Sequence, residues 1–392
     1  NKILYILLAV GMLTAGSCGT EDLDPTLAQQ KLEDNAVNAV SDLEALLYGA
    51  YNRMSASGYY GRDYLVTNEV RTPNVFSNGN SGRFTTQAAF QQLPNGIYIW
   101  DNAYDVIANA NVIIGTDPAN LEGSQAVASH VQGQAYAIRA LAHFDLLKTY
   151  GQMYVDDSED LGIPYIKEFK GENEIPARET IDSNIEDIMA DLQTAYDMMD
   201  AGSYSTGSKV YMSKYTAKAL ESRVAIQFGM WEEARDAAEI VIESGQYSIV
   251  EAENYTSSFD VDGGANSIFE IAQSSTDYPG SDRMDFIWRG STYGDIEVLP
   301  TVLDIYEEDD VRLDVLGYEG ERLRNIAKYP DIDSNIIVIR YEEVILNYVE
   351  ALYNLGEEGE ALTWLNKLAE ARNIDPYTEI SDEIILLERR RD

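Results

Sequence analysis

Residues 141–151 read LAHFDLLKTYG, an apolar-rich helical stretch that ends on a glycine. Two later stretches end in the same way, at Phe228-Gly229 and at Leu355-Gly356, and a second alanine-containing segment follows each of them. Glycine readily terminates a helix, and alanine lets two helices approach closely. The pattern is typical of tetratricopeptide (TPR) helix pairs, but the three glycines lie much farther apart than the period of about 34 residues of a tandem array. Long insertions between the pairs are therefore predicted.

Apolar periodicity predicts helices along most of the chain. Side chains that step by three and four residues line two helix faces: Trp100, Tyr104, Ile107, Asn111 and Ile114, and Val131, Ala135, Ile138, Ala142 and Leu146. Further helices are predicted over Ala36–Ser55, Ile181–Met199, Lys214–Phe228, Trp231–Ser244, Tyr341–Leu355 and Gly359–Ala371. Short β-rich pieces at Ser267–Ile271 and Ile336–Ile339 predict small hairpins or buried single strands. The fold class is therefore mostly α, with TPR-like helix pairs as scaffold, long irregular insertions and a few short strands.

The composition is that of a globular, strongly acidic chain. Its 392 residues are 45% hydrophobic, and 67 acidic side chains against 28 Lys and Arg give a net charge of −39. Nucleic-acid affinity comes mainly from Lys and Arg that neutralise phosphates, so a nucleic-acid partner is excluded, and strongly anionic glycans are disfavoured. An acidic surface that keeps an exported protein soluble explains the charge without any specific electrostatic role.

The N-terminal segment predicts export and a lipid anchor. Residues 3–13 are apolar, follow Lys2, and lead into small residues directly before Cys18, the one cysteine of the chain. Eleven apolar residues rise only about 16 Å as a helix, too little for a permanent membrane span. We expect a lipoprotein signal peptide over 1–17, a lipidated acidic tether over 18–33 that begins at Cys18, and one domain over 34–392. An ordinary secretory leader with an incidental cysteine is the alternative, since Ala15 stands where lipoboxes carry leucine.

Motifs for catalysis, nucleotide binding or metal binding were sought and not found. His130 and His143 have no metal-type spacing, no nucleotide cradle occurs, and His143 is interpreted as structural. The acidic runs at 156–160 and 307–310 are interpreted as solvated loops or helix ends rather than as paired glycosidase carboxylates. Residues 260–264 resemble the start of a calcium loop but lack its later ligands. No cofactor, metal site or enzymatic activity is predicted.

Aromatic and polar residues suited to ligand binding are present, and they lie mainly in segments that interrupt the helices. Irregular segments are predicted at Ser77–Gly82, Gly202–Ser208, Gly263–Asn266 and Ser274–Pro300. Sugar rings stack on aromatic side chains, and their hydroxyls need polar partners. An aromatic platform with polar helpers is therefore predicted from Tyr59, Tyr60, Tyr64, Tyr278, Trp288 and Tyr293 with Arg71, Asn74 and Arg289. The alternative is that these aromatics pack loops onto the scaffold, as Trp100, Tyr104, Trp231 and Trp364 are expected to pack in the core.

Several motifs in order resemble the SusD/RagB family of outer-membrane nutrient-binding lipoproteins. The segment Asp22–Pro25 resembles the start of the mature family proteins, and the spacing of Trp100, Tyr104, Ile107 and Asn111 resembles a family helix. The other matching segments are 137–146 with Tyr150-Gly151, Gly162–Pro164, Arg178–Thr180, Asp191-Leu192, Lys218–Leu220, Trp231–Tyr247 and Arg340–Leu346 with Glu350-Ala351. The chain ends at Leu387–Asp392, where family members continue, so a C-terminal truncation is expected.

The resemblance implies a cell-surface, outward-facing lipoprotein of the outer membrane that takes part in nutrient uptake. It implies that the protein captures an oligosaccharide, or a peptide as RagB-type receptors do, and delivers it to a SusC-like TonB-dependent transporter. Two further alternatives remain open: a helical glycoside-active enzyme, and a TPR-like scaffold that binds only protein. The sequence does not identify the ligand.

Overall fold

A computed structural model describes residues 37–91, 99–154, 159–170, 175–200, 208–276 and 279–392. The predicted signal peptide, the tether with Cys18, and Tyr278 lie outside the described residues. Within these ranges, no helix is both long enough and apolar enough to cross a membrane.

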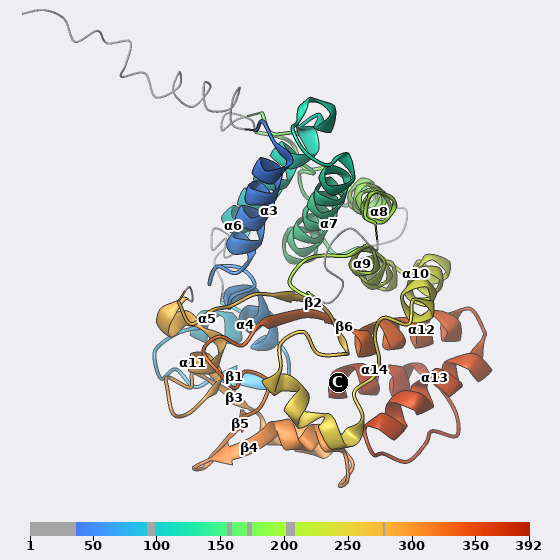
Figure 1. The fold of residues 1–392 in the computed structure, drawn as a ribbon. Helices are drawn as coiled ribbons and strands as arrows, with labels where there is room; N and C mark the ends of the chain where they lie inside the picture. Colours follow the sequence, from blue (N-terminus) through green and yellow to red (C-terminus); the bar gives the residue numbers. More distant parts are fainter. Residues whose placement is uncertain (1–36, 92–98, 155–158, 171–174, 201–207, 277–278) are drawn as a thin grey trace, which may run out of the picture.

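An array of packed helices forms the scaffold, and the fold is mostly α as predicted. Figure 1 shows α3, α6, α7 and α8 side by side, and the array continues through α9 and α10 to the C-terminal helices. All of these helices except α14 follow a predicted apolar stripe, because the spacing of apolar side chains decides which face is buried. The helices of this array are α3 (Val40–Met54), α6 (Trp100–Gly115), α7 (Gln125–Tyr150), α8 (Ile181–Met198), α9 (Lys214–Gln227), α10 (Trp231–Glu243), α12 (Tyr341–Asn354), α13 (Glu358–Ala371) and α14 (Asp382–Arg391).

Two of the three predicted glycine stops behave alike and one does not. Gly229 between α9 and α10 and Gly356 between α12 and α13 have φ of 69° and 80°, the left-handed conformation that glycine adopts without strain. Each glycine lets the chain reverse into the second helix of a TPR-like pair. Gly151 instead has φ −61° and ψ 156°, so the chain leaves α7 in an extended conformation. A Cβ at Gly151 would lie 2.5 Å from the carbonyl oxygen of Leu147, and glycine is required there for space.

Helix α7 is the centre of the array. It packs against α6 and α8 and also touches α3 and α9. Its alanines at 135, 137, 140 and 142 are fully buried, which lets neighbouring helices approach closely. Charged residues on this helix, among them Arg139 and Asp145, are buried as well and must find partners inside the protein.

The strands form three separate antiparallel pairs in the described ranges. They are β1 (Val75–Ser77) with β3 (Ile296–Val298), β2 (Ser267–Ile271) with β6 (Ile336–Arg340), and β4 (Leu316–Glu319) with β5 (Arg322–Asn325). The sequence predicted β2 and β6 as local hairpins or single strands, but they pair with each other across the insertion. Both strands are rich in buried Ile and Val side chains, so the partner is chosen by the core and not by a nearby turn.

Short helices fill the insertions. They are α4 (Asp63–Glu69), α5 (Thr85–Ala88), α11 (Met284–Trp288) and the 3₁₀ turns η2 (Pro118–Asn120), η3 (Ala252–Asn254), η4 (Thr256–Asp260), η5 (Gly280–Asp282), η6 (Pro300–Ile305) and η7 (Val311–Val315). The segment 274–300, predicted as irregular, therefore contains a helix and strand β3. Pairing of β3 with β1 brings this segment against residues 75–77.

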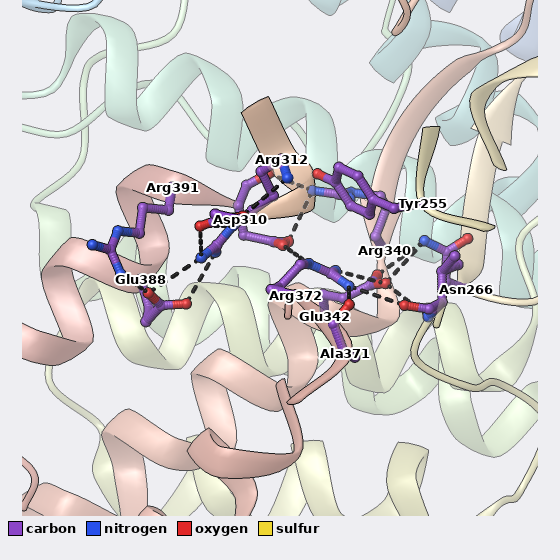
Figure 2. A network of polar contacts seen from close by, with 12 residues as sticks. Tyr255, Asn266, Asp310, Arg312, Arg340, Glu342, Ala371, Arg372, Glu388 and Arg391 are labelled. Carbon is purple, nitrogen blue, oxygen red and sulfur yellow. Dashed lines mark hydrogen bonds and ion pairs between the residues drawn. The ribbon is translucent and has the colours of Figure 1, made fainter. Parts of the chain in front are cut away.

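A buried ion-pair network fastens the insertions to the C-terminal helices (Figure 2). The guanidinium of Arg312, fully buried, donates to both oxygens of Asp310 at 2.9 and 2.8 Å and to Glu388 of α14 at 3.0 Å. Buried Arg372, just after α13, donates to Glu342 of α12 at 3.1 Å. Charges inside a protein persist only when paired in this way. Asp310 belongs to the acidic run predicted to be solvated, and its burial against Arg312 corrects that prediction for this residue.

Candidate functional site

Three of the predicted platform tyrosines are inside the protein. Tyr59, Tyr60 and Tyr64, in and after the turn between α3 and α4, have at most 6% of their surface exposed. Their hydroxyls all donate to the buried carboxylate of Asp145 on α7, at 2.7, 2.8 and 2.6 Å. We call these four residues the tyrosine cluster. Rings without an exposed face cannot stack on a ligand, so this part of the predicted platform is corrected.

The tyrosine cluster is a stabilising device. The three rings contact one another with centroids 4.7 to 5.9 Å apart. Burial and then the Asp145 carboxylate raise the pKa of Tyr59, Tyr60 and Tyr64 well above the usual value, so the hydroxyls stay protonated and donate at all physiological pH. Hydrogen bonds from three O–H donors replace the water that the Asp145 carboxylate loses on burial. The cluster thereby ties the α3–α4 turn to α7.

A different set of tyrosines forms a pocket at the C-terminal end of α3. Tyr48 and Tyr51 on α3 and Tyr211 before α9 surround it, with centroids of Tyr211 at 5.6 and 5.7 Å from the other two. Tyr48 is 44% exposed. The pocket has a volume of about 230 Å³, and its remaining lining consists of Asn52, Ser55, Val210, Ile271, Ala272, Gln273 and Ser274. We call it the aromatic pocket.

Polar groups of the aromatic pocket are placed to meet hydroxyls. The side-chain nitrogen of Gln273 is buried and has no hydrogen-bond partner among the described residues, while its backbone N–H donates to Asn335 at 3.0 Å. A buried donor without a partner costs about 1–3 kcal/mol. The hydroxyl of Tyr51 donates to Gln134 at 2.6 Å and accepts from the N–H of Met212 at 2.9 Å. The ring of Tyr51 is therefore held in place, and its face is available to the pocket.

A second aromatic surface is formed by Arg83 together with residues 282–293. Arg83 lies over the exposed ring of Tyr293 at 4.9 Å and also pairs with Asp282 at 3.3 Å. The ring of Phe286 packs on Tyr293 at 5.6 Å, and Arg283 stacks on Phe286 at 4.0 Å. We call these five residues the arginine–tyrosine surface. Tyr293 is the predicted platform residue that the structure places on the surface here.

The remaining predicted residues lie elsewhere or are already engaged. Trp288 is 5% exposed and, with Asn74, lines another pocket of about 450 Å³ that the C-terminal residues also line. The Asn74 side chain accepts from Arg390 at 2.9 Å. Arg289 pairs with Glu319 at 3.3 Å and donates to the carbonyl oxygen of Ile326. Arg71 is half-buried after α4, and none of the four contributes to the aromatic pocket.

The described residues form no cluster of metal-ligating side chains. No group of three or more His, Cys, Asp or Glu side chains is arranged to hold a metal ion in the ranges that the structure describes. His143 is fully buried and stacks on Tyr165 at 3.8 Å, with Nδ1 at 2.9 Å from the carbonyl oxygen of Arg139 and Nε2 accepting from the N–H of Ile166. Its predicted structural role is confirmed by these contacts.

The aromatic pocket was missed by reasoning from the sequence, although a signal was present. Tyr48, Tyr51, Asn52 and Ser55 step by three, one and three residues and so lie on one helix face. A helix face that combines aromatic and amide side chains next to the helix end is a reasonable ligand surface. Tyr211 and Gln273 come from distant segments, and nothing local in the sequence links them to α3.

Comparisons with known proteins agree with this architecture. A family described as starch-binding and associating with the outer membrane, SusD-like, matches residues 23–226, more than half of the chain. The SusD family matches residues 326–392. A SusD-like protein of Formosa agariphila is 24% identical over 424 residues, which cover 94% of this chain and 81% of the relative.

Solved structures show the same fold. A Bacteroides vulgatus protein described as sugar-binding is similar with a TM-score of 0.84 at 26% identity, over 91% of this chain and 84% of that one. A SusD superfamily protein of Bacteroides thetaiotaomicron is similar with a TM-score of 0.82 at 24% identity, over 90% and 86% of the two chains. The match over most of the helical scaffold, together with the family motifs along α6 and α7, establishes that the chain belongs to the outer-membrane-associated SusD family.

Proposed function

We propose that the protein binds a neutral oligosaccharide in the aromatic pocket and delivers it to a SusC-like TonB-dependent transporter. The observation that carries the proposal is the pocket itself, in which three tyrosine rings lie beside an unpartnered amide of Gln273. Sugar C–H faces pack on aromatic rings, and sugar hydroxyls both donate to and accept from amides and hydroxyls. The sugar-binding description of the Bacteroides vulgatus structure supports the same ligand class.

The ligand is expected to extend beyond one sugar ring. A pocket of about 230 Å³ holds a single ring, and the arginine–tyrosine surface offers a second aromatic face. Tyr293 offers a ring face there, and Arg83 and Arg283 offer N–H donors beside it. The net charge of −39 disfavours an anionic glycan by long-range repulsion, which leaves neutral chains as the favoured class.

We propose that the protein is exported, lipidated at Cys18 and held on the outer face of the outer membrane by an acidic tether over 18–33. Support comes from the leader pattern over 1–17 and from the membrane association of the family. Several acyl chains on one cysteine anchor a protein stably where one chain would not. The transporter partner is inferred from the same family membership.

We propose binding without turnover. Four buried carboxylates already have hydrogen-bond partners inside the protein. Asp145 accepts from three tyrosines, Asp310 and Glu388 accept from Arg312, and Glu342 accepts from Arg372. A glycosidase needs two carboxylates free to face one scissile bond. The lining of the aromatic pocket contains no carboxylate among the described residues.

Isothermal titration calorimetry of the protein from residue 19 onward tests the proposal. Neutral oligosaccharides of graded length and a matched peptide panel are titrated, and the oligosaccharides are recovered and sized to detect cleavage. We expect saturable oligosaccharide binding without cleavage. The affinity should fall at least about tenfold in the double variant Tyr48→Ala, Tyr211→Ala, because ring stacking contributes most of the affinity for a sugar.

The matched control is Tyr318→Ala. Tyr318 on β4 is 60% exposed but lies outside the aromatic pocket and the arginine–tyrosine surface, so its loss should leave the affinity unchanged. Binding of peptides and not oligosaccharides would assign the pocket to a peptide ligand. Cleavage of the oligosaccharide would contradict the non-catalytic proposal.

A further inference from the structure

Exposed apolar side chains are concentrated in the connection between α7 and α8. The described part of the chain exposes ten large hydrophobic side chains, and four of them lie in this connection: Met153, Leu161, Phe169 and Ile175. Ile175 is 98% exposed and Phe169 is 45% exposed. Scattered apolar side chains are normal on a surface, but a local concentration marks a place where another molecule covers it.

Two of these side chains line a pocket beside α6. It has a volume of about 520 Å³ and lies between α6 and the segment around Pro164 and Ile166. Trp100 and Tyr104 of α6 line it together with Phe169, Ile175 and Pro176. We call it the apolar groove. The prediction that Trp100 and Tyr104 pack against the core is confirmed, but one side of each faces this groove.

Ring packing and one hydrogen bond connect the walls of the groove. The ring of Trp100 packs on Tyr104 at 4.9 Å and on Tyr150 at 5.1 Å. The hydroxyl of Tyr104 donates to the carbonyl oxygen of Pro164 at 2.8 Å, which ties α6 to the opposite wall. A partner would therefore dock without first ordering this surface, and a fixed tryptophan in a pocket is a typical anchor point of protein interfaces.

The charges around the groove are mostly negative. Asp101, Asp105 and Glu168 line it, against a single cation, Lys170. Lys170 lies 3.5 Å from Glu168, and Asp105 is paired with Arg53 of α3 at 2.9 Å. Asp101, on the exposed side of α6, adds negative charge at the edge of the groove. Complementarity therefore calls for a partner with a basic group next to its apolar one.

The lining differs from that of the aromatic pocket in a way that selects a different occupant. The groove combines three aromatic side chains with Ile107, Ile166, Ile175 and two prolines, and the Tyr104 hydroxyl already donates inside the protein. The groove places large apolar side chains next to carboxylates, a combination that suits an apolar side chain with a basic neighbour. We propose that the apolar groove is a docking surface for a polypeptide segment of a partner protein, a segment with one large apolar side chain beside Lys or Arg. The proposal does not depend on what the aromatic pocket binds.

Fluorescence of the whole protein with short peptides tests the docking surface. The probes are acetylated pentapeptides Gly-Lys-X-Lys-Gly in which X is Leu, Phe or Met, with Gly-Glu-X-Glu-Gly and Gly-Lys-Ser-Lys-Gly as peptide controls. Trp100 reports directly, and Trp100→Phe identifies its share of the signal. We expect only the basic apolar peptides to quench the fluorescence with saturation. Their affinity should fall at least about tenfold in the double variant Ile175→Asp, Phe169→Asp.

Val261→Asp is the matched control, because Val261 is 62% exposed and lies far along the chain from the groove residues. We expect it to bind the peptides like the unmodified protein. Both aspartate variants should keep their melting temperatures because the changed side chains are exposed. Absence of saturation by every basic apolar peptide, or equal binding to the Ile175→Asp with Phe169→Asp variant, would overturn the proposal. Quenching of Trp100 by neutral oligosaccharides would instead make the groove a sugar site. Dimerisation that Ile175→Asp abolishes, seen by sedimentation, would make the occupant a second copy.

Discussion

The tyrosine cluster and the aromatic pocket are each built on three tyrosines, but the two triads meet opposite surroundings. In the cluster, all three hydroxyls converge on the buried carboxylate of Asp145 and the rings have no free face. In the pocket, the rings of Tyr48, Tyr51 and Tyr211 border a cavity, and an amide of Gln273 lies unpartnered beside them. The first triad uses its polar groups to stabilise the fold, and the second leaves its ring faces for a ligand.

The difference shows that a tyrosine can have its hydroxyl hydrogen-bonded inside the protein whether or not its ring borders a pocket. Tyr51 has both of its hydroxyl hydrogen bonds inside the protein and still borders the pocket. Tyr59 has its hydroxyl satisfied and its ring enclosed. Substitutions should therefore separate the two regions, with stability lost at the cluster and affinity lost at the pocket.

The largest effect is expected at the centre of the cluster. Asp145→Ala leaves three buried hydroxyls without their acceptor, and we expect the free energy of unfolding to fall by about 3–5 kcal/mol. Urea denaturation followed by circular dichroism measures it. Asp105→Ala, an exposed partner of Arg53, is the matched control and should change stability by less than about 0.5 kcal/mol.

A compensated variant sharpens this test. In Asp145→Leu combined with Tyr59→Phe, Tyr60→Phe and Tyr64→Phe, both partners of every hydrogen bond are replaced by apolar groups. Such exchanges are often nearly neutral, so much of the lost stability should return. If the four-fold variant is no more stable than Asp145→Ala, the hydroxyl–carboxylate contacts are not the cause of the loss.

The next effect is a pH dependence that originates at His143, two residues before Asp145 on α7. Burial lowers the pKa of His143 to about 3, because the neutral ring stacks between buried groups and accepts from the N–H of Ile166. The unfolded chain binds the proton near pH 6.5, so stability is fully present above that pH and falls as the pH is lowered toward 3. The slope due to this group is about 1.4 kcal/mol per pH unit.

Chemical denaturation at a series of pH values between 7 and 5 measures that slope. His143→Gln should flatten it over this range, while His130→Gln should flatten it less, since His130 titrates in a less buried site. If the slope of the His143→Gln variant equals that of the unmodified protein, the buried imidazole is not the titrating group.

The smallest effect is the loss of single hydroxyls. Tyr60→Phe removes a buried donor to Asp145 and should cost about 1–2 kcal/mol, whereas Tyr48→Phe on the pocket should cost less than about 0.5 kcal/mol. Thermal unfolding of the two variants side by side gives the comparison. Equal losses would mean that the two triads are not energetically distinct.

The helical scaffold could be predicted from the sequence because apolar spacing is a local property. The helix predicted over Ile181–Met199 is observed as Ile181–Met198, and Trp231–Ser244 as Trp231–Glu243. The first predicted helix began at Ala36 but is observed from Val40, because Ala39 is extended, forms a β-bridge with Glu122 and donates its N–H to Asp42. Pairing of β2 with β6 could not be predicted, because the register of distant strands depends on the core that both enter.

The candidate site could be predicted only in part. Tyr293 and the segment that carries it were identified by their aromatic and irregular composition, and the structure places Tyr293 on the surface beside Arg83. The buried tyrosines could not be told from ligand-binding ones, because the partner that encloses them, Asp145, is more than eighty residues away. Gln273 and Tyr211 likewise meet α3 only after the chain has folded.

Nuclear magnetic resonance with ¹³C-labelled tyrosine rings tests the central claim most directly. Signals are assigned with single Tyr→Phe variants, and a neutral oligosaccharide that binds by calorimetry is titrated. We predict that Tyr48 and Tyr211 shift with saturation while Tyr59, Tyr60 and Tyr64 do not. Shifts confined to Tyr59, Tyr60 and Tyr64, or an unchanged Tyr48 and Tyr211 at saturation, would contradict the assignment of the aromatic pocket as the ligand site.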